Sequence, residues 1–153
     1  MKHLLIVYHS QSGNTQRMAE AALAGATNEL ITETEVRLLR AADAKPEDLL
    51  WAEGLLLGTP ENFGYMSGGM KDFLDRTFYQ VEGQILSLPY AIFISAGNDG
   101  SGALRAIRRI ANGYPFKEVQ EPVIAQGEVT DEHLGSCEEL GMTLAAGLEA
   151  GIF

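Results

Sequence analysis

The sequence "YHSQSGNTQRMAEA", residues 8–21, joins an apolar run to an alanine-rich segment. The run before it, Leu4–Val7, has no polar alternation, which is typical of a strand covered on both faces of a parallel sheet. The segment 15–26 has the periodicity of a helix. The six positions between them carry small polar residues and one glycine: Ser10, Gln11, Ser12, Gly13, Asn14 and Thr15.

This composition indicates a loop that holds a phosphate. The first turn of a helix offers unpaired amide groups and a partial positive charge, which together bind anions. Ser10, Ser12 and Thr15 add hydroxyl donors, and Gly13 allows the backbone to curve closely. Because the loop has no basic residue, we expect a monoester phosphate held by amides and hydroxyls. Simple capping of the helix is the alternative.

Strand and helix patterns alternate along the whole chain. We expect further strands at 32–39, 54–58 (ended by Thr59-Pro60), 90–95 and 123–125. Helices are expected at 46–51, 68–79, after Gly102 and after Thr130. This alternation predicts an α/β fold: a doubly wound, five-stranded parallel sheet of order 2-1-3-4-5 between two helical layers. Since no linker or repeat interrupts the pattern, residues 1–153 are expected to form a single domain.

Composition limits the partners. The chain has 11 basic and 21 acidic residues, and this net charge of −10 argues against nucleic acid and anionic membranes. The single cysteine, Cys137, excludes an internal disulfide and fits a reducing compartment. No apolar stretch approaches the roughly 18 residues of a membrane span, and Leu4–Val7 is too short for a signal peptide. We therefore expect a cytoplasmic protein, with its oligomeric state, homo-oligomer included, left open.

Three loops are candidates for chemistry. In doubly wound sheets, ligands bind beyond the carboxyl ends of the strands, where the strand order changes direction. The loops 10–15, 59–67 and 95–102 follow the first, third and fourth strands, which are neighbours in the expected order. The sequence lacks the glycine-lysine loop of nucleotide triphosphatases and the Gly-x-Gly-x-x-Gly motif of dinucleotide sites. It also lacks the acidic residues of a receiver domain, having His9-Ser10 and Gly58-Thr59 at those positions.

The pattern Ser10-x-Ser12-Gly13-Asn14-Thr15 resembles the FMN phosphate loop of flavodoxins and their relatives. The segment "GTPENFGYMSGGMKDFLDRT", residues 58–77, is similar to the corresponding segment of WrbA-type NAD(P)H:quinone oxidoreductases and NADPH-dependent FMN reductases. The resemblance implies a flavodoxin-like fold and bound FMN. It places the flavin ring beside the backbone of 59–66 and the ring's pyrimidine oxygens at the amides of 95–102. The cofactor-binding residues it implies are Ser10, Gln11, Ser12, Gly13, Asn14, Thr15, Thr59, Pro60, Glu61, Asn62, Phe63, Gly64, Ser95, Ala96, Gly97, Asn98, Gly100 and Gly102.

The sequence also departs from these families. Electron-carrier flavodoxins commonly hold the flavin between two aromatic side chains, one from each ring loop, and residues 95–102 contain none. WrbA-type proteins have a longer insertion before the fourth strand and a histidine near the end of the next helix. Here only 79–89 precede that strand, and the histidine region reads Ala111-Asn112-Gly113-Tyr114. These differences leave the flavin prediction intact and weaken the prediction of quinone reduction.

The predicted function is an FMN-dependent oxidoreductase that takes electrons from NAD(P)H, its transient donor, and reduces small acceptors such as quinones or free flavin. No side chain is predicted to be catalytic, because the cofactor carries the chemistry, and no metal site is expected. The alternatives are a one-electron carrier that meets a redox partner protein, and a non-catalytic FMN-binding module. Arg105, Arg108 and Arg109 either attract nucleotide phosphates or form the polar face of a helix.

Overall fold

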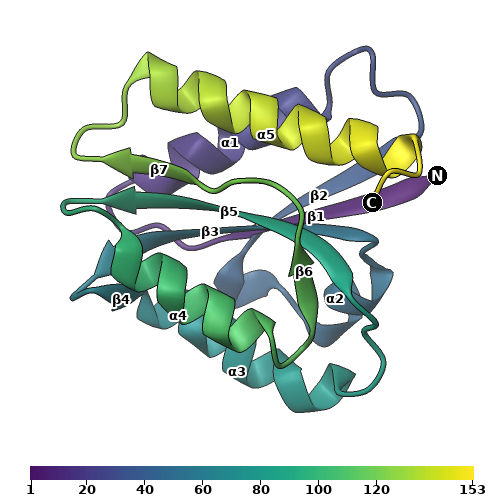
Figure 1. The fold of residues 1–153 in the computed structure, drawn as a ribbon, viewed down its shortest axis with the longest axis horizontal. Helices are drawn as coiled ribbons and strands as arrows, with labels where there is room; N and C mark the ends of the chain where they lie inside the picture. Colours follow the sequence, from purple (N-terminus) through teal and green to yellow (C-terminus); the bar gives the residue numbers. More distant parts are fainter.

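A parallel β-sheet forms the centre of the computed structural model, which describes residues 1–153 (Figure 1). Its strands β1 (Lys2–Tyr8), β3 (Gly54–Asn62) and β5 (Leu88–Ala96) are flanked at one edge by β2 (Thr34–Arg40). At the other edge, β6 (Phe116–Glu118) and β7 (Val123–Gln126) both pair in parallel with β5. The five strand positions therefore follow the predicted order 2-1-3-4-5.

Helices cover both faces of the sheet. Helices α1 (Asn14–Ala26) and α5 (Asp131–Glu149) lie on one face, and α2 (Pro46–Trp51), α3 (Gly68–Val81) and α4 (Ser101–Ala111) lie on the other (Figure 1). A single 3-10 turn, Ala41–Asp43, precedes α2. Alternate side chains of β1 enter opposite layers, with Leu4 packed beneath α1 and α5 and Leu5 on the α3 side. The predicted three layers are confirmed.

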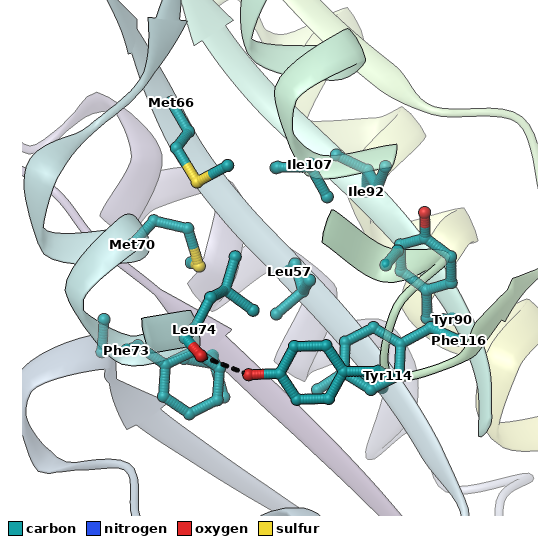
Figure 2. Packing of buried hydrophobic residues seen from close by; sticks show 14 of the residues in the cluster. Leu57, Met66, Met70, Phe73, Leu74, Tyr90, Ile92, Ile107, Tyr114 and Phe116 are labelled. Atoms are coloured by element: carbon teal, nitrogen blue, oxygen red, sulfur yellow. Dashed lines mark hydrogen bonds between the residues drawn. The ribbon is translucent and has the colours of Figure 1, made fainter. Parts of the chain in front are cut away.

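The layer that contains α3 and α4 holds the larger apolar core (Figure 2). At its lower end the rings of Tyr114 and Phe116 stack with their centroids 4.3 Å apart. The Tyr114 hydroxyl donates to the carbonyl oxygen of Leu74 and shares a 2.8 Å hydrogen bond with the Thr77 hydroxyl (Figure 2 shows the first). Because burial leaves this hydroxyl no water, it raises the pKa of Tyr114 to about 12. These contacts fix the segment after α4 against α3.

The third strand is longer than predicted. We expected Thr59-Pro60 to end it, but β3 continues to Asn62 and turns back as the antiparallel strand β4 (Tyr65–Met66). The turn residues Phe63 and Gly64 have φ values of 52° and 69°, as a two-residue hairpin turn with two positive φ angles requires. The loop that was expected to follow β3 is therefore a β-hairpin.

The fifth strand is divided in two. The predicted strand 123–125 is confirmed as part of β7, but β6 was not predicted, since three residues are too few for a periodic pattern. β6 pairs with the start of β5 and β7 with its end. The Val119 amide still donates to the Tyr90 carbonyl of β5 (3.0 Å), and residues 120–122 connect the two strands. The remaining predicted elements are present, with ends that differ by no more than two residues. None of the helices combines the length and the apolar composition needed to cross a bilayer.

Candidate functional site

The three loops singled out from the sequence meet at one end of the sheet. Their strands end together, because Tyr8 is in register with Gly58 and Gly58 with Phe93. Side chains then connect the loops in pairs. Asn62 donates to Gln11 (2.9 Å), linking the second loop to the first. The carboxylate of Glu61 accepts from the Gly102 amide (2.9 Å), linking the hairpin to the third loop.

The first turn of α1 has unpaired amide groups. Gly13 is the N-cap residue, with a φ of 100°, and no side chain caps the helix. The first hydrogen bond of the helix runs from the Arg17 amide to the Gly13 carbonyl (3.0 Å). The amides of Asn14, Thr15 and Gln16 therefore have no protein acceptor. The first turn has no acidic side chain either, so its partial positive charge is not offset.

The other long helices differ from α1 in this respect. Ser67 caps α3 by accepting from the Met70 amide (3.3 Å), and Thr130 caps α5 in the same way. The Glu61 carboxylate accepts from the first amides of α4. Among the four long helices, only α1 leaves all three of its first amides without a protein acceptor. Such a helix end binds anions, phosphate among them.

Some hydroxyls of the first loop form hydrogen bonds within the protein, and one is free to bind a ligand. Ser10 Oγ accepts from the Gly13 amide (3.1 Å) and so shapes the loop. The Thr15 hydroxyl, expected to be a free donor, is instead buried and shares a 2.8 Å hydrogen bond with the Ser95 hydroxyl, which ties α1 to β5. Ser12 is exposed and its hydroxyl has no protein partner. The groups left free to meet a phosphate are therefore the amides of the first turn and the Ser12 hydroxyl.

Side chains of the second loop hold the β3–β4 hairpin in place. Thr59 is fully buried, and its hydroxyl accepts from the Ser67 amide (3.0 Å). Glu61 points to α4, so its side chain is not available to a flavin. Phe63 at the hairpin tip is fully exposed and has a left-handed backbone, which is unusual for a bulky residue. Such strained positions cluster at functional sites.

The third loop is open at its tip and tight at its end. Gly97 and Asn98 are exposed. The Asp99 carboxylate accepts from the amide and the hydroxyl of Ser101, and these hydrogen bonds lower the pKa of Asp99. A Cβ at Gly102 would lie 1.9 Å from the carbonyl oxygen of Gly64. Gly102 is therefore needed for the contact between α4 and the hairpin, a role that accounts for it without a ligand.

His9 also lies at this site, although no role was predicted for it. Its ring lies against Gly69 in the first turn of α3, where a Cβ would be 2.4 Å from a ring carbon. Its Nδ1 is buried without a hydrogen-bond partner. Burial, and then the charge of Arg40, lower the pKa of His9. The imidazole therefore adds no positive charge beside the phosphate loop at neutral pH.

Comparison with known proteins identifies the family. The model of the NADPH-dependent FMN reductase family matches residues 1–131. The chain belongs to this family. A flavodoxin of Aquifex aeolicus is 39% identical over 161 aligned positions, which cover 95% of this chain and 86% of the relative. An NAD(P)H dehydrogenase (quinone) of Acidithiobacillus ferrooxidans is 32% identical over 122 positions, which cover 67% of this chain and 60% of the relative.

The fold comparison agrees. A flavodoxin from the domain Archaea has a TM-score of 0.80 and 26% identity, and the match covers 96% of this chain and 99% of the other. The fold is therefore flavodoxin-like, and the chain is an FMN-binding protein of this type. The site fits FMN: the unpaired amides of α1 suit its single phosphate, and the hairpin and the tip of the third loop suit its ring. The relatives that match this chain thus include one named flavodoxin and one named NAD(P)H dehydrogenase (quinone).

Proposed function

We propose that the protein is an FMN-dependent oxidoreductase that takes hydride from NAD(P)H and passes two electrons to a small acceptor, such as a quinone or free flavin. The observation that carries the proposal is the open third loop. Gly97, Asn98 and Asp99 are exposed, and none has an aromatic ring to cover the flavin. Hydride transfer requires the reacting atoms to approach to about 3–3.5 Å, so a nicotinamide needs one uncovered flavin face.

Each part of the site has a defined role in this proposal. The amides of Asn14, Thr15 and Gln16, with the Ser12 hydroxyl, hold the phosphate. The hairpin borders the ring, and Glu61 keeps the hairpin fixed to α4. Bound FMN supplies the redox chemistry, accepting hydride and releasing electrons to the acceptor. The protein contributes position and polarity, and no side chain is required as an acid or base.

An anaerobic reduction experiment tests the proposal. The FMN-loaded protein is mixed with NADH or NADPH, and the visible absorption of the flavin is recorded. We expect rapid bleaching by at least one nicotinamide and recovery when a soluble quinone is added. Bleaching by dithionite but by neither nicotinamide would refute the proposal, since the flavin would then be reducible but closed to hydride donors.

A substitution sharpens the test. Asn98→Trp places an aromatic ring over the proposed open face, so it should slow nicotinamide oxidation while FMN stays bound. Ala24→Trp is the matched control, because Ala24 is exposed on α1 away from the three loops. Equal nicotinamide oxidation by both variants would show that the donor does not approach past the third loop.

A one-electron carrier is the second candidate, and the flavodoxin that is 39% identical favours it. A carrier separates the two one-electron reduction potentials of its flavin, whereas a hydride acceptor has no such need. A stepwise potentiometric titration distinguishes the two. Two well-separated steps, together with no response to either nicotinamide, would support the carrier.

A further inference from the structure

Helix α4 has a positive face in an otherwise acidic protein. The helix contains three arginines and no acidic residue, although the chain has a net charge of −10. Arg108 is neutralised by Glu118 through two hydrogen bonds of 2.8 Å. Arg105 and Arg109 are exposed and form no ion pair. Asp99 lies near Arg105, but its carboxylate already accepts two hydrogen bonds from Ser101.

A groove of about 430 Å³ between α3 and α4 adjoins this face. Its apolar lining includes Leu74, Phe78 and Ile110, and the Lys71–Asp75 ion pair (2.8 Å) and Arg109 line it as well. Tyr79 is 80% exposed and Tyr65 is 42% exposed, both on this groove. Exposed tyrosine and arginine around an apolar hollow is the composition of binding hot spots.

The groove is continuous with the flavin site. Tyr65 belongs to β4, the second strand of the hairpin, and lies two residues from Phe63 at its tip. Helix α4 begins where the third loop ends, and Glu61 fixes its first turn to the hairpin. A molecule that occupied the groove and contacted Arg105 would therefore border the site of the flavin.

We propose that the α4 face and the α3–α4 groove bind a small acidic electron-transfer protein. Its carboxylates pair with Arg105 and Arg109, and an apolar side chain at its contact surface enters the groove. The inference rests on FMN binding but not on the nicotinamide reaction. Each reduced partner, for example an iron–sulfur protein, gives up one electron, so two encounters and two protons from water reduce one FMN.

Charge supports a protein over a smaller ligand. Arg105 and Arg109 are exposed one helical turn apart and line a hollow that is wide open to solvent, so they present separate charges rather than an enclosed anion pocket. The apolar groove beside them needs an apolar occupant, which an acidic protein surface supplies and a bare phosphate does not.

The sign of the salt dependence tests the inference. The FMN-loaded protein is titrated calorimetrically with an oxidised acidic [2Fe–2S] ferredoxin at low and at physiological ionic strength. Because both proteins are acidic, they repel one another overall. If the ferredoxin bound to a surface other than α4, salt would screen this repulsion and the affinity would rise with salt concentration. Docking on α4 predicts the reverse, with affinity falling about tenfold or more as salt rises. No binding at low salt, or binding that strengthens with salt, would overturn the inference.

Variants locate the contact. Arg105→Glu with Arg109→Glu should weaken ferredoxin binding at least about tenfold at low salt. The control, Lys2→Glu with Lys45→Glu, makes the same change in net charge at exposed positions on other elements and should change affinity less than about threefold. Equal losses in both double variants would show that only net charge matters, and would overturn the inference.

Two further measurements test the apolar contact in the groove and the alternative that α4 binds a nucleotide. Tyr79→Ala should weaken binding about threefold or more and leave the salt dependence unchanged, since it removes only apolar contact. If the α4 double variant instead raises the KM for NADPH and leaves ferredoxin binding intact, α4 serves a nucleotide and the inference is wrong. Failure of nicotinamides to reduce the flavin, with ferredoxin binding intact, would contradict only the proposed function.

Discussion

Replacing Asn14 by aspartate should stabilise the FMN-free protein and weaken FMN binding. Asn14 is the first residue of α1, whose first three amides are unpaired. A carboxylate at this position interacts favourably with the partial positive charge of the helix end, an effect of about 0.3–1 kcal/mol. The same carboxylate would repel the phosphate of FMN. The two effects have opposite signs only if α1 is an anion site.

The size of the repulsion follows from Coulomb's law. A phosphate held by the first turn lies about 5 Å from a carboxylate at residue 14, and it carries nearly two negative charges. Even at the dielectric constant of water, the repulsion is about 1.7 kcal/mol, and partial burial increases it. We therefore expect a loss of FMN affinity of at least about tenfold. Riboflavin, which has the same ring and no phosphate, should bind unchanged.

The assay measures the thermal stability of the FMN-free protein and its affinities for FMN and riboflavin. Thermal unfolding of the FMN-free variant should show a higher Tm, and fluorescence titration gives the two flavin affinities. Asn28→Asp is the control, because it adds the same charge beyond the opposite end of α1. Equal loss of riboflavin and FMN affinity would refute the reasoning, because the substitution would then have disturbed the binding of the flavin ring rather than that of the phosphate.

Glu61→Ala should lower the free energy of unfolding by about 1–3 kcal/mol, because the first amides of α4 lose a charged acceptor. Urea denaturation measures this, and faster amide exchange at Gly102 is expected with it; an unchanged midpoint would mean that the contact contributes nothing. Cys137 should resist thiol reagents at pH 8 in the folded protein and react in denaturant, since burial raises its pKa to about 12. Because the unfolded thiol ionises near pH 9 and the folded one does not, stability should fall as pH rises from about 9 to 12, and a Cys137→Ala variant should lack this part of the decline.

Much of the fold could be predicted from residue patterns. The buried strands are continuous apolar runs, and the helices predicted from 68 and after Thr130 begin there, capped by Ser67 and Thr130. The β3–β4 hairpin was missed because Pro60 is normally a strand terminator. Here Thr59 and Ser67 form hydrogen bonds across the base of the hairpin. Such a contact between residues eight positions apart leaves no periodic signal.

The site could be predicted by segment but not by atom. All three predicted loops meet, because the strand order places their ends together. The sequence did not indicate which polar groups the protein uses itself. The hydroxyls of Thr15 and Ser95 form a hydrogen bond with each other, and Glu61 caps α4, so the side chains of three residues predicted at the ligand site serve the fold instead. These partners are 80 and 41 residues apart, beyond the reach of local pattern analysis.

The division of the fifth strand position has a consequence for how this chain can change in length. Residues 120–122 leave the sheet between two segments that are each held in register by their own pairing with β5. An insertion there would shift neither register, since each side is fixed independently. The entropy of closing a loop grows slowly, so ten added residues would cost only about 1 kcal/mol. This connection is therefore a natural position for grafting a recognition segment, at the edge of the sheet and next to the positive face of α4 through the Arg108–Glu118 pair.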